Sequence, residues 1–216
     1  MTVPFVPVAV ATEMTPLTSS SGGAYESTLA LGHWKDDLFD CCKFGVFHPS
    51  FMWACCVPQI LMAQVLTRLK MNLWAEPAPE NEYKVTFRRM LILVRLYWII
   101  SGILAPPGPE FEAQEDGTMK VTRTDSSLWQ RCVHNLIISM FSLYSLILLI
   151  KLRIAVRRRG AIPEKYCAGM EDCCCAFWCG CCTVAQIARQ TADFDERRAL
   201  CCSPTGLPVM TPVIIV

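Results

Sequence analysis

Cysteines are concentrated near the end of the chain, where seven of the fourteen lie between Tyr166 and Thr183. Thiols this close together form disulfides in an oxidising compartment, whereas in a reducing one they bind metals, carry acyl groups or act in redox chemistry. The candidate metal ligands in this group are Cys173, Cys174, Cys175, Cys179, Cys181 and Cys182. Which chemistry they can perform depends on the compartment that they face.

The Cys-x-x-Cys spacing of Cys179 and Cys182 lets two sulfurs reach one ion, so zinc or another thiophilic divalent metal is the cofactor that this pattern allows. A tetrahedral site needs two more ligands, and if the two cysteine-containing segments pack together Cys41, Cys42 or Cys167 could supply them. Three alternatives remain open. Free cysteines are often small buried side chains, those near a membrane can be palmitoylated, and exposed ones can sense oxidants.

The composition is that of a membrane protein, with 53% hydrophobic residues, 18% charged residues and a net charge of only +1 over 216 residues. The small net charge gives no reason to expect nucleic acid as a partner. Residues 1–34 contain neither Lys nor Arg. The basic start of a secretory signal is therefore missing, and we expect insertion into the bilayer through internal segments.

Two apolar segments, about residues 87–105 and 133–150, are long enough to be membrane spans. The second has only His134 and Asn135 as strongly polar residues, and the first is interrupted by Arg95 and stops at Pro106-Pro107. The alternative is that both are buried helices of a soluble core. The lengths favour a helical hairpin in the lipid bilayer.

Basic residues orient this hairpin. Lys and Arg are concentrated before the first span and after the second, whereas the connecting loop, residues 106–131, is mostly acidic. Because Lys and Arg accumulate on the cytosolic side, we expect a multi-pass protein with both termini in the cytosol, in the plasma membrane or an organelle membrane. The cysteines other than Cys132 then face a reducing compartment, which argues against a disulfide framework.

Two apolar helices that contain cysteines should flank the hairpin on the cytosolic side, which makes the predicted fold an all-α membrane protein. One helix begins at Pro58 and runs to about Trp74, and the other runs from Asp172 to about Thr191. We expect a disordered tail over residues 1–28, a cysteine-rich membrane domain over 29–208 and an extended tail over 209–216. Ala63-Gln64-Val65 and Ala185-Gln186-Ile187 echo each other, but three matched residues arise easily by chance.

Four polar residues lie in these apolar segments, where they could line a pathway or simply pack. At helical spacing, Gln186 and Arg189 continue one stripe with Cys175, Cys179 and Cys182. The other two are Gln64 and Arg95, of which Arg95 could instead extend to the nearer interface. No catalytic triad, phosphate-binding loop or carboxylate pair stands out, so we expect no enzyme.

The spacing Asp172-Cys173, Cys179, Cys182, Gln186, Arg189 resembles the placenta-specific gene 8 family, which includes plant cadmium-resistance and cell-number-regulator proteins. Trp34, the Leu38–Cys41 run and the Pro58–Gln64 stretch are similar to the family's N-terminal part. The family pattern there has Cys-Pro-Cys and Gly-Gln, whereas this chain has Val57 and Gln59 around Pro58, and Ala63 before Gln64. Cys55 and Cys56 lie nearby but out of register.

The resemblance implies a homo-oligomeric membrane protein that supports cation or heavy-metal homeostasis. A two-span hairpin cannot enclose a pore alone, so transport would require several copies. A second hypothesis is a structural or regulatory membrane protein that does not transport, with packed or palmitoylated cysteines, acting through protein partners.

Overall fold

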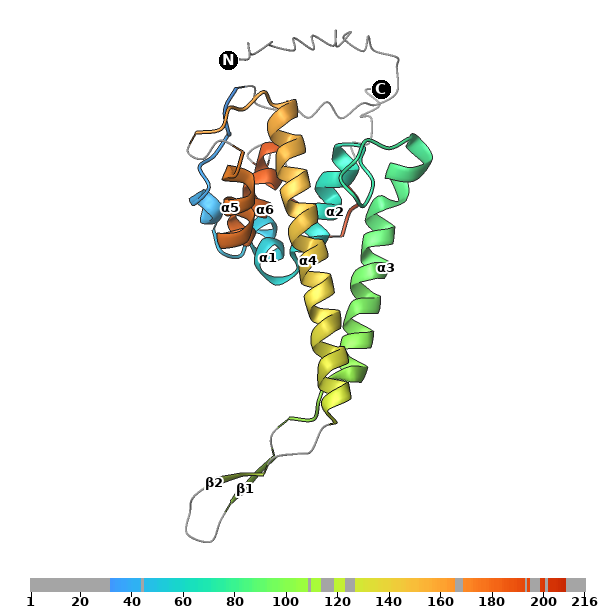
Figure 1. Cartoon of the computed structure of the whole chain (residues 1–216). Coiled ribbons are helices and arrows are strands. Elements are labelled where there is room, and N and C mark those ends of the chain that lie inside the picture. Colours follow the sequence, from blue (N-terminus) through green and yellow to red (C-terminus); the bar gives the residue numbers. More distant parts are fainter. Residues whose placement is uncertain are drawn as a thin grey trace, which may run out of the picture.

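The computed structural model describes residues 32–43, 45–108, 110–113, 119–122, 127–165, 169–192, 194, 199–200 and 202–208. Both predicted tails, 1–28 and 209–216, lie outside these ranges. Most of the described chain is helical: a short η1 (Asp40–Cys42), α1 (Pro49–Cys56), α2 (Pro58–Arg68), α3 (Glu80–Leu104), α4 (Leu128–Arg159), α5 (Glu171–Trp178) and α6 (Gly180–Gln190). Figure 1 shows α3 and α4 side by side, with α1, α2, α5 and α6 gathered around one end of α4.

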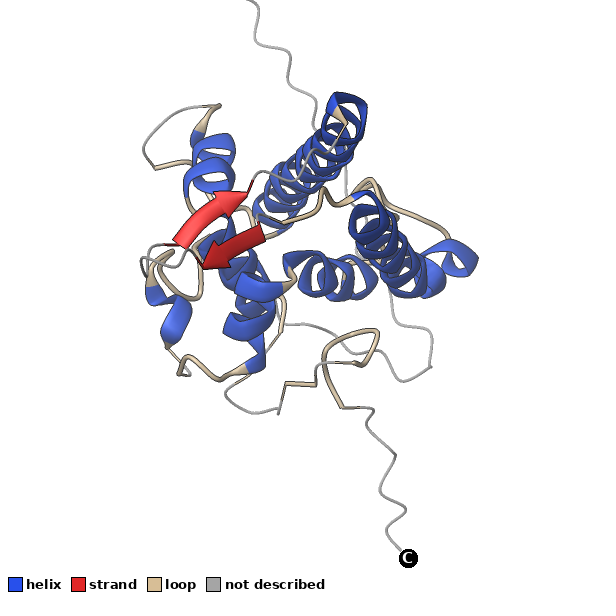
Figure 2. Cartoon of the chain, turned by 90° about the horizontal axis from the view of Figure 1, so that it is seen from below, coloured by secondary structure: helices blue, strands red, loops and turns tan. Residues whose placement is uncertain are grey.

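Two strands were not predicted. β1 (Glu110–Ala113) and β2 (Met119–Thr122) pair antiparallel between α3 and α4, with Glu110 opposite Thr122. They are the two short arrows in Figure 2. The sequence indicated an acidic loop here, because charged residues obscure the alternation by which a strand is recognised.

α4 has 32 residues, and within the described ranges it is the one helix that is long and apolar enough to cross a membrane. Its most apolar stretch is only 11% buried. A core helix of a soluble protein would be mostly covered, so an apolar surface left open along α4 favours association with a membrane. The predicted helical membrane protein is thus confirmed for its helices and for one candidate span.

The ends of α4 and α2 follow from local signals. Ser127 caps the start of α4 by accepting a hydrogen bond from the Gln130 amide, and the helix ends at Arg159, directly before Gly160. The left-handed residue beyond it is Ala161, at φ +50°. α2 ends at Arg68 rather than near Trp74, because Lys70 turns left-handed at φ +55° and lets the Met71 amide bond back to the Leu66 carbonyl, 2.9 Å away.

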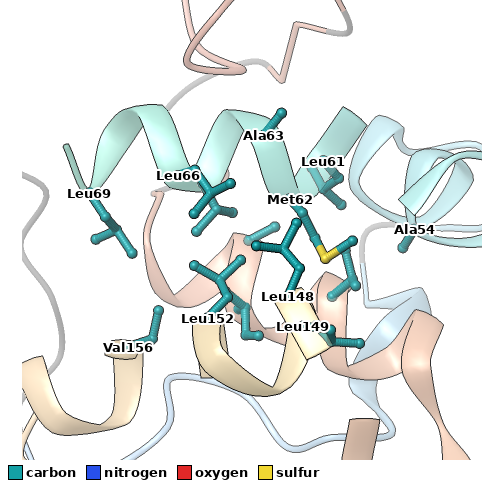
Figure 3. Packing of buried hydrophobic residues seen from close by; sticks show 14 of the residues in the cluster. Ala54, Leu61, Met62, Ala63, Leu66, Leu69, Leu148, Leu149, Leu152 and Val156 are labelled. Atoms are coloured by element: carbon teal, nitrogen blue, oxygen red, sulfur yellow. The ribbon is translucent and has the colours of Figure 1, made fainter. Parts of the chain in front are cut away.

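The core lies between α2, α6 and the C-terminal half of α4. Every residue of α2 from Leu61 to Thr67 and every residue of α6 from Cys182 to Gln190 is buried. Figure 3 shows α2 side chains meeting those of α4, among them Met62, Leu66, Leu148, Leu152 and Val156. Burying a Leu or Val side chain contributes about 1.5–3 kcal/mol, so this contact fixes the position of the cysteine-containing helices on α4.

Gly206 holds the C-terminal loop against α2. Its φ is +74°, and a Cβ there would lie 2.8 Å from Oε1 of Gln64, whose amide donates to the carbonyls of Leu200 and Ser203. We expect Gly206→Ala to lower the free energy of unfolding by about 1–2 kcal/mol, from backbone strain alone. Thermal unfolding in detergent measures it. Gly102→Ala in α3 is the control and should be neutral or stabilising, because nothing lies within 4 Å of its Cβ position; equal stability of the two variants would contradict the expectation.

Candidate metal centre

The segment that carries the cysteine group is two helices, not the single helix predicted from Asp172 to about Thr191. The break is at Cys179, with φ −138° and ψ 59°. The Cys179 amide closes α5 by donating to the Cys175 carbonyl at 3.1 Å, and the Thr183 hydroxyl donates to the same carbonyl at 2.9 Å. The stripe predicted from Cys175 to Arg189 is therefore interrupted at Cys179, and Cys182, Gln186 and Arg189 keep their helical spacing within α6.

The break brings three thiols together. The sulfurs of Cys179, Cys181 and Cys182 all lie within 4.8 Å of one another, and those of Cys181 and Cys182 are 3.9 Å apart. Two sulfurs bound to one tetrahedral zinc at about 2.3 Å each lie roughly 3.8 Å apart. The spacing of these sulfurs therefore fits a thiophilic metal ion.

A second segment adds thiols to this group. Cys55, at the end of α1, neighbours Cys181, and Cys41, in η1, neighbours Cys182. Burial raises the pKa of the Cys182 thiol, and the contacts with Cys179 and Cys41 raise it further. Cys41 and Cys55 are thus further thiols beside this group, but among the described residues the sulfurs that all lie within 4.8 Å of one another are those of Cys179, Cys181 and Cys182. We call Cys41, Cys55, Cys179, Cys181 and Cys182 the thiol cluster.

The other three candidate ligands lie apart from this cluster on α5. Cys173 is exposed, and Cys174 and Cys175 are partly buried. Cys175 lines a cleft of about 530 Å³ together with Trp34, Arg153 and Gln186. Burial raises the pKa of the Cys175 thiol, although the nearby Arg153 charge lowers it.

Arg153 occupies the floor of that cleft, and its side chain is only 2% exposed. It donates to Asp172 Oδ1 at 3.1 Å and to Gln186 Oε1 at 2.6 Å, and its guanidinium carbon lies 4.6 Å from the Trp34 ring centroid. Arg157, one turn further, donates to Asp172 Oδ2 at 2.9 Å. These bonds join α4 to the start of α5 and to the middle of α6.

Gln186 and Arg189 both contact Asp36, in the segment before η1. The Gln186 amide donates to the Asp36 carbonyl at 3.0 Å, and Arg189 Nε donates to Asp36 Oδ2 at 3.0 Å. Burial alone would raise the pKa of Asp36, but hydrogen bonds and positive charges from Lys43 and Arg189 hold it below its ordinary value. The two polar residues predicted on α6 therefore hold the N-terminal segment in place.

The other two predicted polar residues lie elsewhere. Gln64 is buried in α2 beneath the C-terminal loop, and Arg95 is exposed on α3. The structure thus brings Gln186 and Arg189 together through Asp36, and it places Gln64 and Arg95 in two other environments.

Sequence reasoning missed Arg153 and Asp36 as buried charges and did not assign Cys55 to the ligand set. Arg153 and Arg157 were read only as part of the basic run that sets topology. The available signal was that Arg153 and Arg157 are four residues apart, on one helix face, and that the acidic pair Glu171-Asp172 follows the end of that helix in the sequence. No local pattern indicated Cys55, because its contact with Cys181 depends on tertiary packing.

The weak sequence echo corresponds to a structural repeat. α1 and α5 each have eight residues, α2 and α6 each have eleven, and one residue, Val57 or Cys179, separates the members of each pair. Both break residues have similar dihedral angles, with φ −144° and ψ 71° for Val57. Gln64 and Gln186 occupy equivalent places in α2 and α6, and each binds the backbone of a loop that covers its helix.

Comparison with known proteins identifies the chain at the level of its family. The model of the PLAC8 family matches residues 34–190, which include both helix pairs and the two long helices between them. No curated protein and no solved structure matches the chain. This is the placenta-specific gene 8 family that the cysteine spacing had indicated, and the match covers well over half of the sequence; the chain belongs to the PLAC8 family.

Proposed function

We propose that α3 and α4 form a hairpin that crosses the membrane twice, with both chain ends in the cytosol. α3 has 25 residues, lies beside α4 and stops where Ala105 leads into Pro106-Pro107. Large apolar side chains on α3 are exposed, among them Ile92, Leu96, Trp98, Ile99 and Ile103. The basic residues at the start of α3 and the end of α4 lie at the same end of the hairpin, which supports a cytosolic location for that end.

We further propose that the thiol cluster binds a thiophilic divalent cation such as zinc or cadmium. The observation that carries this proposal is the mutual approach of the Cys179, Cys181 and Cys182 sulfurs within 4.8 Å. Cys55 or Cys41 would complete four-coordination. Such a site holds a cation and performs no catalysis, which suits a role in heavy-metal or cation homeostasis; transport would require a homo-oligomer, because two spans are too few to enclose a pore.

We expect Cys181→Ser and Cys55→Ser each to reduce bound zinc or cadmium at least tenfold at limiting metal, because each substitution removes one of the proposed thiolate ligands. The measurement is metal content per chain of purified protein after equilibrium dialysis. Cys173→Ser is the matched control: it is an exposed cysteine of the same region, outside the cluster, and should leave metal content unchanged.

Equal metal content in all four proteins would remove the ligand assignment. Loss of metal in Cys181→Ser but not in Cys55→Ser would exclude Cys55 and leave Cys41, in η1, as the fourth ligand. Cys181 and Cys55 are both exposed, so their replacement should leave the core intact.

A structural or regulatory role without transport is the second candidate. Its supporting observation is that Gln64, Gln186 and Arg189 are occupied in buried hydrogen bonds, while Arg95 is exposed on a different helix. Cation flux into proteoliposomes decides between the two. Metal binding without flux would favour the structural role, and flux by the protein alone would exclude it. Acyl-exchange labelling would show whether the exposed cysteines are palmitoylated.

A further inference from the structure

Helices α1, α2, α5 and α6, which we call the cytosolic unit, carry both helix breaks on one edge, and this edge is rich in exposed apolar groups. The edge consists of residues 55–57 and 177–179, and we call it the lower edge. The side chains of Phe177 and Trp178 are 64% and 82% exposed, and Cys55 and Cys56 are exposed at the other break. In Figure 1, α1 and α5 lie beside the upper half of α4, with β1 and β2 at the opposite end of the molecule. Such a patch is unfavourable in water.

Contacts with α4 fix the position of the lower edge along that helix. Gln59, two residues beyond the first break, donates to Ser145 Oγ at 3.0 Å. Gly180, next to the second break, lies against Leu149, whose Cδ2 would be 3.8 Å from an added Cβ. Ser145 and Leu149 both belong to the apolar part of α4, so the lower edge lies beside the candidate span and not beyond its end.

Distances along α4 give the depth of the lower edge in the bilayer. At about 1.5 Å per residue, Ser145 lies roughly 24 Å from Trp129, and Lys151, the first basic residue after the apolar part, lies roughly 33 Å from it. The hydrocarbon core of a bilayer is about 30 Å thick. With Trp129 at the external boundary, the lower edge reaches the cytosolic boundary of the hydrocarbon, where Trp is favoured.

An apolar groove opens at this same height. It has a volume of about 300 Å³ and is bounded by the two helix pairs and α4. Its lining includes Pro58, Met62, Leu146, Leu149, Ala176 and Val184. Near the same level of α4, Trp74 is 55% exposed and its ring meets that of Tyr144 edge to face, with centroids 5.7 Å apart. A second exposed tryptophan therefore lies at this level.

We propose that the lower edge is a lipid-binding surface: Phe177 and Trp178 lie in the headgroup region of the cytosolic leaflet, and the groove opens to lipid acyl chains. The proposal rests on the membrane crossing proposed for α3 and α4. Continuity with that hairpin selects lipid as the occupant, since the surface is already held at the boundary of the bilayer. Cys55 and Cys181 line the groove, so the thiol cluster would open onto the membrane interface.

Depth-dependent fluorescence quenching tests the proposal. The full chain and Trp178→Phe are reconstituted in bilayers whose phosphatidylcholine carries bromine either near the glycerol or near the end of the acyl chain. Subtracting the emission of the variant isolates Trp178, and its exposure makes the substitution harmless to the fold. We expect this emission to be quenched at least twofold more by the shallow bromines than by the deep ones. Trp98→Phe provides the same subtraction for Trp98 in α3, which should show the reverse order.

The Trp98 arm separates the two proposals. Quenching of Trp98 but not of Trp178 would overturn the lipid contact and keep the hairpin in the membrane. Quenching of Trp178 without Trp98 would keep the lipid contact and remove the crossing of α3, whereas no quenching of either would overturn both proposals.

Discussion

Replacing Arg153 by methionine is expected to lower the free energy of unfolding by about 3 kcal/mol, because it removes a buried cation whose partners stay buried. Methionine retains the apolar length of the side chain, so the loss reports mainly on the charge. Glu171 and Asp172 are 9% and 5% exposed and would lose a counter-charge, and Gln186 would lose its donor. Arg157 still pairs with Asp172, which places the effect at the lower end of the range for a broken buried pair.

Chemical unfolding in detergent, followed by helical circular dichroism, measures this loss. Arg158→Met is the matched control, since Arg158 is the exposed arginine next to Arg157 and its replacement should change the stability by less than about 0.5 kcal/mol. If the two variants were equally stable, the bonds from Arg153 to α5 and α6 would not hold these two helices on α4.

Local signals predicted the long helices well. Pro58 at the first turn of α2, Pro106-Pro107 after α3 and Gly160 after α4 each act within one helical turn, and each helix begins or ends beside its signal. Gly180, directly after Cys179, is only a weak signal for the break between α5 and α6, because a lone glycine is tolerated inside a helix. The break is held by the Thr183 hydroxyl, which reaches back across it to the Cys175 carbonyl.

The thiol cluster was predicted only in part for a related reason. Spacing placed Cys179 and Cys182 on one site, and the structure confirms that their sulfurs are close. Cys55 was discounted because it is out of register with the family pattern, yet the end of α1 brings it to Cys181. A ligand set drawn from η1, α1 and the α5–α6 segment depends on how α1 packs on α6, and no sequence motif specifies that contact.

Sequence patterns did not predict which charged residues are buried. The basic run from Lys151 to Arg159 was read as a topology signal, but Arg153 is buried while Arg158 is exposed. A charged residue can be buried only where partners compensate it, and those partners lie on α5 and α6. The position of a charge in the sequence therefore left its burial undetermined.

Asp36→Asn is expected to lower the free energy of unfolding by about 3–5 kcal/mol near pH 7, because it leaves the Arg189 cation, only 2% exposed, without its counter-charge. The matched control is Asp37→Asn at an exposed neighbouring position, which should be close to neutral. Arg189→Met alone should also destabilise, and the double variant with Asp36→Asn should be more stable than the sum of the two losses predicts, since it contains neither buried charge. Additive losses would show that the pair is not coupled.

The pH dependence tests the same ion pair without relying on a second substitution. In the folded protein the pKa of Asp36 lies below its ordinary value of 3.8, so the carboxylate stabilises the fold fully above that value and loses this contribution as the pH falls through the lower folded pKa. Asn resembles the protonated acid. The difference in stability between the wild-type protein and Asp36→Asn should therefore be largest near neutral pH and shrink once the pH falls below about 4. Other carboxylates titrate in both proteins and cancel in this difference; a gap that stayed constant to about pH 2 would exclude an ionised Asp36 as the partner of Arg189.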